Sequence, residues 1–216
     1  MKQIKRLLGD AIFRSEVTLH GGLLGNLLYV VLNLVSGLLY RSAWFLSLAF
    51  YYLLLSLMRA MLVQYVHQKE LGQDIPAETR RYRACGVLLL FMNQALVGIV
   101  IYMAAGDRGF SYPGTLIYAM ATYTFYITIT AIINVVKFRK YGSPVLSAAK
   151  IVSLTAALVS MLSLETAMLS RFGSEDHRFR HIMTASSGGS VCVIVLVMAV
   201  FMIIRPKRNE KRRLSP

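Results

Sequence analysis

Acidic residues and cysteines are scarce in this chain. Its 216 residues include 10 Asp and Glu against 24 Lys and Arg, and only two cysteines. Cys85 and Cys192 stand alone, without the spaced Cys and His partners of a metal or redox motif. We therefore interpret both as small packing residues, and expect no cofactor and no metal.

Motifs for catalysis and for known channels are also missing. The sequence has no G-x-S-x-G nucleophile elbow and no H-E-x-x-H metal helix. It has no T-V-G-Y-G potassium filter and no run with arginine at every third position, the pattern of a voltage sensor. An intramembrane enzyme is therefore the least favoured class of function.

The chain consists largely of long apolar runs, and 56% of its residues are hydrophobic. A helix needs roughly 20 apolar residues to cross a bilayer, and these runs do not alternate as barrel strands do. The predicted fold is an all-α polytopic membrane helix bundle of six transmembrane helices arranged as three hairpins. Uncharged runs are Gly21–Tyr40, Ala84–Gly106, Gly109–Val136 and Ile182–Ile204; Ser42–Val66 contains Arg59, and Pro144–Ser170 contains Lys150 and Glu165.

Both ends of the chain lie outside these runs, which gives three parts. Residues 1–20 place apolar side chains at helical spacing between basic ones, which predicts an N-terminal interfacial amphipathic helix; a simple leader into the first span is the alternative. Residues 21–204 form the transmembrane domain. Residues 205–216 are a basic tail, expected to be disordered and to bind anionic inner-leaflet headgroups.

The net charge of +14 has a topological explanation. If the N-terminus is cytoplasmic, Lys and Arg gather on the inner side, as the positive-inside rule requires. The exceptions on the outer side are Arg41, Arg108, Arg171, Arg178 and Arg180. This predicts that both termini are cytoplasmic, and that membrane lipid rather than nucleic acid is the partner of the charges.

Small residues mark one face of the fifth run. Such residues let helix backbones approach closely in lipid, so this face is predicted to pack against other helices. Its members, spaced by three and four residues, are Ser153, Ala156, Ser160, Ser163, Ala167 and Ser170.

Polar side chains inside the runs are candidates for a functional site, because intramembrane carboxylates are costly and often functional. The predicted intramembrane polar site consists of Glu165, Asn93, Gln94, Thr124 and Thr128. Asn26 and Asn33 share one face of the first run. Arg59 and Lys150 are expected to extend to the inner headgroups instead.

Three stretches of the second half, 123–134, 138–150 and 160–170, resemble an uncharacterised family of six-span membrane proteins from Gram-positive anaerobic bacteria. That resemblance implies a bacterial plasma membrane and this architecture, but no known activity. The architecture is also similar to that of ABC-2-type exporter membrane subunits, which implies no function by itself.

A small transporter, or a transporter subunit, of unknown substrate is the leading hypothesis, because polar residues occur in several spans. The alternative is a non-transporting scaffold or accessory protein that packs through its fifth span. Homo- and hetero-oligomers are both open at this point.

Overall fold

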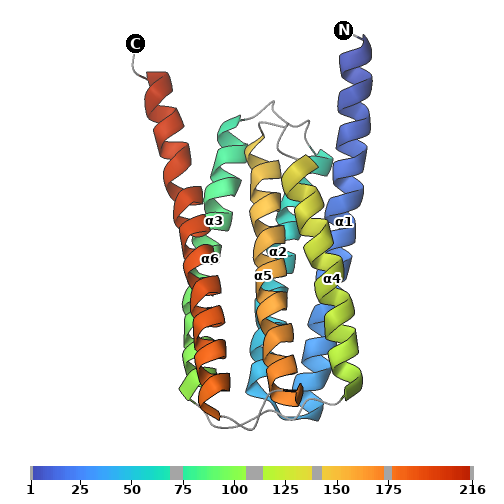
Figure 1. Cartoon of the computed structure of the whole chain (residues 1–216). Coiled ribbons are helices and arrows are strands. Elements are labelled where there is room, and N and C mark those ends of the chain that lie inside the picture. The colour runs from blue at the N-terminus through green and yellow to red at the C-terminus, as the bar shows by residue number, and fades with distance from the viewer. Residues whose placement is uncertain (1, 69–74, 106–113, 138–142, 173–176, 215–216) are drawn as a thin grey trace.

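The computed structural model describes residues 2–68, 75–105, 114–137, 143–172 and 177–214, with side chains over 20–67, 75–102, 116–136, 143–172 and 178–204. Within these ranges the chain is helical and contains no strand. The helices are α1 (Lys2–Leu39), α2 (Ala43–Gln68), α3 (Ile75–Ala105), α4 (Gly114–Lys137), α5 (Pro144–Phe172) and α6 (His177–Leu214). The predicted all-α helix bundle is confirmed (Figure 1).

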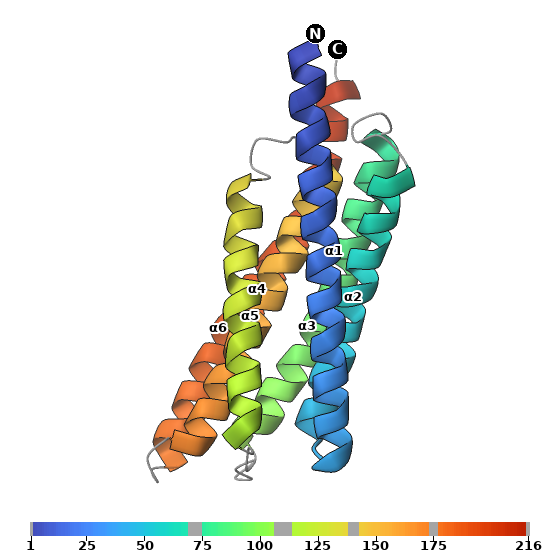
Figure 2. The ribbon, with the colours of Figure 1, turned by 90° about the vertical axis from the view of Figure 1, so that its right-hand side faces the viewer.

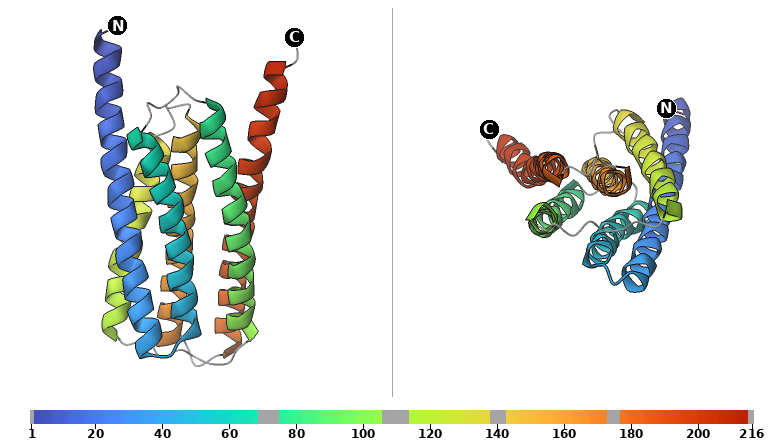
Figure 3. Two further views of the ribbon diagram at one scale, coloured as in Figure 1. Left: turned by 180° about the vertical axis from the view of Figure 1, so that it is seen from behind. Right: turned by 60° about the horizontal axis from the view of Figure 1, so that its bottom comes forward.

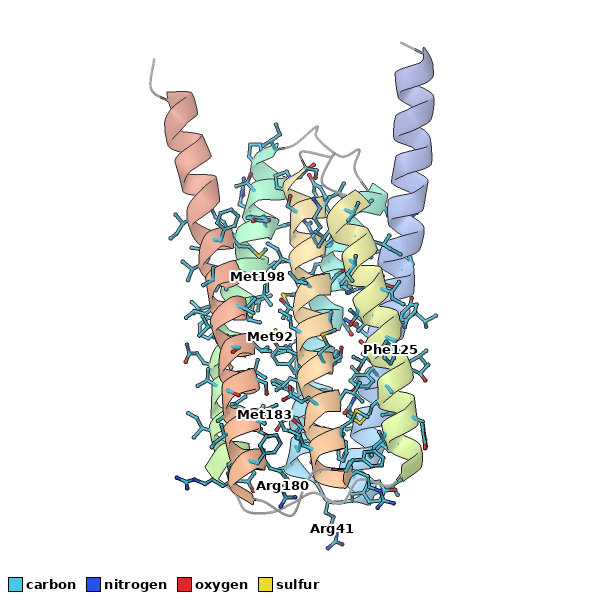
Figure 4. All side chains as sticks on the ribbon, in the orientation of Figure 1. Arg41, Met92, Phe125, Arg180, Met183 and Met198 are labelled. Carbon is cyan, nitrogen blue, oxygen red and sulfur yellow. The ribbon has the colours of Figure 1, made fainter. Side chains whose placement is uncertain are left out.

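Each of these six helices contains a segment long and apolar enough to cross a membrane. Large hydrophobic side chains point outward from the bundle, including Leu28, Phe91 and Phe125, which are 63%, 71% and 66% exposed. Figure 4 shows Phe125 on the outer side of α4. Such a surface is unfavourable in water but matches hydrocarbon. The fold is that of a multi-pass membrane protein.

Helix α5 occupies the middle of the bundle. It packs against α2, α3, α4 and α6, and the tilted view at the right of Figure 3 shows it among these four helices. In its most apolar stretch 67% of residues are buried, against 50% or less in the other five helices. Its small side chains permit this central position, because neighbouring helices can approach its backbone from several sides.

Lateral packing differs from three sequential hairpins. The most extensive helix pairs are α1 with α2, α4 with α5, and α3 with α6. Within the described helices α3 has no comparable interface with α4, so the hairpin arrangement is not confirmed. Glycines explain the α3–α6 pair: a Cβ at Gly86 would lie 2.8 Å from Met202 Cβ, and a Cβ at Gly188 would lie 2.6 Å from Val100 Cγ1.

Residues 40–42 connect α1 to α2. Arg41 has a φ of 48°, in the left-handed region that often ends a helix. The Ser42 amide donates to the Gly37 carbonyl over 3.0 Å, which satisfies one of the last carbonyls of α1. Figure 4 shows Arg41 pointing away from the end of the bundle.

The ends of the chain extend two of the helices. Helix α1 is continuous from Lys2, and α6 continues to Leu214. Both project from the same end of the bundle (Figures 1 and 2). A separate interfacial helix over residues 1–20 is therefore not confirmed, and the expectation of a disordered tail from residue 205 is wrong as far as Leu214. Each segment continues the helix that adjoins it, which requires no new nucleation.

Candidate functional site

Arg59 of α2 is the least expected side chain of the interior, because it is 1% exposed. Its Nη2 donates to Ser153 Oγ of α5 over 3.1 Å. The expectation that Arg59 extends to the headgroups is therefore wrong. The reason is Gly22 of α1: a Cβ there would overlap Arg59 Nη1 and lie 2.8 Å from Cζ. The missing side chain leaves room for an inward-turned guanidinium group.

This guanidinium has no carboxylate partner among the described residues. Its electrostatic neighbours are the hydroxyl groups of Tyr52, Tyr123 and Tyr126. The membrane segments of α1, α2 and α4 contain no Asp or Glu. Glu165 of α5 is twelve residues from Ser153, or ~18 Å along a helix. An arginine within a span costs about 2.5–3.5 kcal/mol on insertion scales, so an unpaired one calls for explanation.

Ser153 joins three helices at this point. Besides the Arg59 contact, its Oγ accepts a hydrogen bond from Asn134 Nδ2 of α4 over 3.3 Å. Asn134 and Ser153 are each 2% exposed. Two donors therefore converge on one hydroxyl oxygen, and α2, α4 and α5 are held together by a polar contact inside the bundle.

Tyrosine rings fill the space between α1, α2 and α4. The rings of Tyr29 and Tyr123 stack with centroids 3.9 Å apart, and Tyr52 meets both edge-on, at 4.7 and 5.8 Å. Tyr123 OH donates to Asn26 Oδ1 over 2.9 Å. Such rings combine a large apolar area with a hydroxyl that needs a partner, so they line an interior that is neither wholly apolar nor wholly polar.

The small-residue face of α5 forms the opposite wall. Ser153, Ala156, Ser160, Ser163 and Ala167 are buried, and Ser170 is half-buried. Because these side chains are small, neighbours reach the α5 backbone. Tyr52 OH donates to the Ala156 carbonyl over 3.1 Å, and Thr124 Oγ1 donates to the Ser160 carbonyl over 3.2 Å.

Several buried polar atoms in this region have no hydrogen-bond partner among the described residues. They are Asn26 Nδ2, Tyr29 OH, Asn33 Oδ1, Arg59 Nε, Asn134 Oδ1 and Ser163 Oγ. Tyr29 OH lies near the side chains of Asn33 and Ser163, without a well-formed hydrogen bond to either. A buried polar atom without a protein partner calls for an explanation, of which bound water or an ion is one.

We call this interior the polar column. From Asn26 to Asn33 alone it extends ~10 Å along α1. It consists of Asn26, Tyr29 and Asn33 of α1, Tyr52 and Arg59 of α2, Tyr123, Thr124 and Asn134 of α4, and Ser153, Ser160 and Ser163 of α5.

The predicted intramembrane site is only partly within this column. Thr124 belongs to it, whereas Asn93 is buried on α3, where its Oδ1 has no partner among the described residues. Gln94 is exposed, and Thr128 and Glu165 are half-buried. No contact between described side chains gathers these five residues into one place. A functional role for Glu165 stays a prediction.

A second buried side chain of a charged type lies near the start of α5. Glu78 of α3 is 0% exposed, and its Oε2 accepts a hydrogen bond from Ser143 Oγ over 2.7 Å. Ser143 directly precedes the first residue of α5, so this carboxylate stands at a helix N-terminus, where negative charge is favourable. We interpret Glu78 as a structural link between α3 and α5.

The sequence placed Arg59 at the inner headgroups rather than in a site, and it did not single out the tyrosines. Tyrosine occurs throughout the spans, so Tyr29, Tyr52 and Tyr123 are not distinguished by type. The shared face of Asn26 and Asn33 was the available signal, and both side chains are fully buried.

Comparisons with models of protein families and with curated proteins find no match to this chain. The class of protein is therefore defined by the fold and the site: a six-helix membrane bundle with a polar interior.

Proposed function

We propose that this protein is a small membrane transporter, or the membrane subunit of one, whose ligand moves along the polar column. The observation that supports it is the gathering of polar side chains from four helices, including an arginine, inside a bundle whose outer surface is apolar. Polar groups within a membrane are costly, and those that face a bundle interior commonly line a substrate or ion pathway.

The scaffold alternative has less support. It requires the small-residue face of α5 to pack against a partner protein. That face is already covered by helices of the same chain, because Tyr52 of α2 and Thr124 of α4 donate to its backbone carbonyls. A partner would have to bind elsewhere on the bundle.

We further propose that both termini are cytoplasmic and that the membrane is a bacterial plasma membrane. The two ends project from the same end of the bundle (Figure 1), and most Lys and Arg residues lie in segments on that side. Positive residues favour the cytoplasmic side, where the basic stretch after residue 204 would meet anionic headgroups.

Labelling with a membrane-impermeant thiol reagent tests this orientation. In a chain without its native cysteines, Arg108→Cys and Gly173→Cys are expected to react from outside intact cells. Gln73→Cys and Tyr141→Cys are expected to react only after the membrane is opened. The reverse pattern would show that the termini are outside.

Water access to the polar column tests transport. With Cys85 and Cys192 replaced by alanine, Ser160→Cys and Ser163→Cys are near-isosteric changes within the column. We expect both to react with a small charged methanethiosulfonate reagent in proteoliposomes, because a ligand pathway must admit water in at least one state.

Ala199→Cys is the matched control, because Ala199 is 0% exposed but lies on α6, outside the column. It should stay unreactive. If the two serine positions react no faster than position 199, the bundle is dry and the transporter proposal is wrong.

A further inference from the structure

We infer that the polar column contains a binding site for an oxyanion, a carboxylate or phosphate group, centred on Arg59. This inference rests on the proposed function and names the chemical class of the ligand. The permanently positive guanidinium of Arg59 lies 1% exposed inside the bundle, and no described carboxylate pairs with it. Among the described residues, no negative charge balances this guanidinium.

The Arg59 guanidinium itself has donors that no described residue uses. The guanidinium gives only Nη2 to a described acceptor, Ser153 Oγ, and its Nε has none. The hydroxyl groups of Tyr123 and Tyr126 lie close enough to interact with its charge, but their hydrogens are donated elsewhere, to Asn26 Oδ1 and to the Gly21 carbonyl. The donors that remain for a ligand are therefore those of the guanidinium itself. A guanidinium with unused N–H groups matches an anion with oxygen atoms and does not match a metal ion or an amine.

Ser153 adds a donor to the same place. Its Oγ accepts from Arg59 and from Asn134, and its own hydrogen has no recorded acceptor among the described residues. A hydroxyl that accepts twice can still donate once. The guanidinium and this hydroxyl thus present positively charged and neutral donors from two helices to one ligand group.

The absence of a side chain at Gly22 leaves the space in which the guanidinium lies. A substitution at residue 22 therefore moves the guanidinium without removing its charge. A methyl group at residue 22 would overlap Arg59 Nη1. The displaced atoms are the far end of a flexible side chain, so the bundle can accept the change while the guanidinium moves. A methyl group at Gly21 would lie 3.4 Å from Tyr126 OH, an ordinary contact.

The experiment measures binding of inorganic phosphate, and separately of acetate, to purified protein in phosphatidylcholine nanodiscs by titration calorimetry at constant ionic strength. We expect saturable binding of at least one of the two anions. Arg59→Gln should weaken it by about 10- to 100-fold, the range expected when a charged hydrogen-bond donor is lost. Arg59→Lys, which keeps the charge without the planar fork, should weaken it less.

Gly22→Ala should also weaken binding, whereas Gly21→Ala should leave it unchanged. This pair keeps the test valid if Arg59→Gln fails to fold. Equal affinities in the two glycine variants would contradict a site at Arg59.

A lipid headgroup is the second source of the same chemistry. Nanodiscs that contain phosphatidylglycerol distinguish it: thermal stabilisation by this lipid that requires Arg59 would identify a lipid phosphate as the bound group. If neither the free anions nor phosphatidylglycerol gives an effect that depends on Arg59, the inference is wrong.

Failure of the site and failure of the transporter proposal are separable. If the anion binds but Ser160→Cys is not labelled, the anion site is supported and the transporter proposal is wrong. If Ser160→Cys is labelled but no binding depends on Arg59, a water-filled pathway is supported and the anion site is wrong.

Discussion

Replacing Ser160 with leucine is expected to lower the free energy of unfolding by about 1–3 kcal/mol. The side chain is 0% exposed, and the carbonyl of the same residue accepts a hydrogen bond from Thr124 of α4. A leucine adds three carbon atoms at a point where α4 contacts the α5 backbone, so the helices must move apart or the side chain must take a strained rotamer. Reversible unfolding in mixed micelles of a mild detergent and dodecyl sulfate measures the change.

Met161→Leu is the matched control, because Met161 is the next residue of the same helix but is 47% exposed. This swap conserves volume and should change stability by well under 1 kcal/mol. If Ser160→Leu were as mild as Met161→Leu, the α4–α5 contact at Ser160 would have to be looser than described.

Replacing Gly86 with leucine is expected to have a similarly large effect at the α3–α6 interface. Even the first carbon of a side chain would lie 2.8 Å from Met202 Cβ and 3.3 Å from the Ala199 carbonyl oxygen. Neither atom is the end of a flexible chain, so α6 has to shift. We expect a loss of about 1–3 kcal/mol in the same unfolding measurement.

Gly98→Leu on the same helix provides the comparison. A Cβ at Gly98 would meet no described atom within 4 Å, and leucine favours a helix over glycine by up to about 1 kcal/mol. This variant should be neutral or slightly stabilised. If Gly98→Leu lost as much stability as Gly86→Leu, the loss would come from replacing glycine itself and not from the contact with α6.

The fold class and the number of spans were predictable because both follow from composition along the chain. Six apolar runs must become six helices, since backbone groups in hydrocarbon have to satisfy one another within a helix or a closed barrel. The face of α5 from Ser153 to Ala167 was also readable, because helical spacing alone places these small residues together. Because close helix packing in lipid depends on small side chains, this face was expected to be buried.

The lateral order of the helices was not predictable from these runs. Short connections limit how far consecutive helices can separate, but they do not choose the neighbours of α3. That choice depends on surface fit, as at Gly86, where α6 approaches the α3 backbone. The same limit applies to the predicted polar site, because the spacing of Gln94 and Asn93 within α3 does not say which of them faces another helix.

The inward position of Arg59 was decided by tertiary structure alone. The position of Arg59 within its apolar run is equally compatible with a side chain that extends to the headgroups. The inward arrangement needs Gly22 on α1 to leave space and Ser153 on α5 to accept a hydrogen bond. These two residues are far from Arg59 in sequence and become its neighbours only when three helices pack. The apolar runs thus suffice to predict a six-span membrane bundle, whereas helix packing sets the position of Arg59, the one fully buried arginine among the described residues.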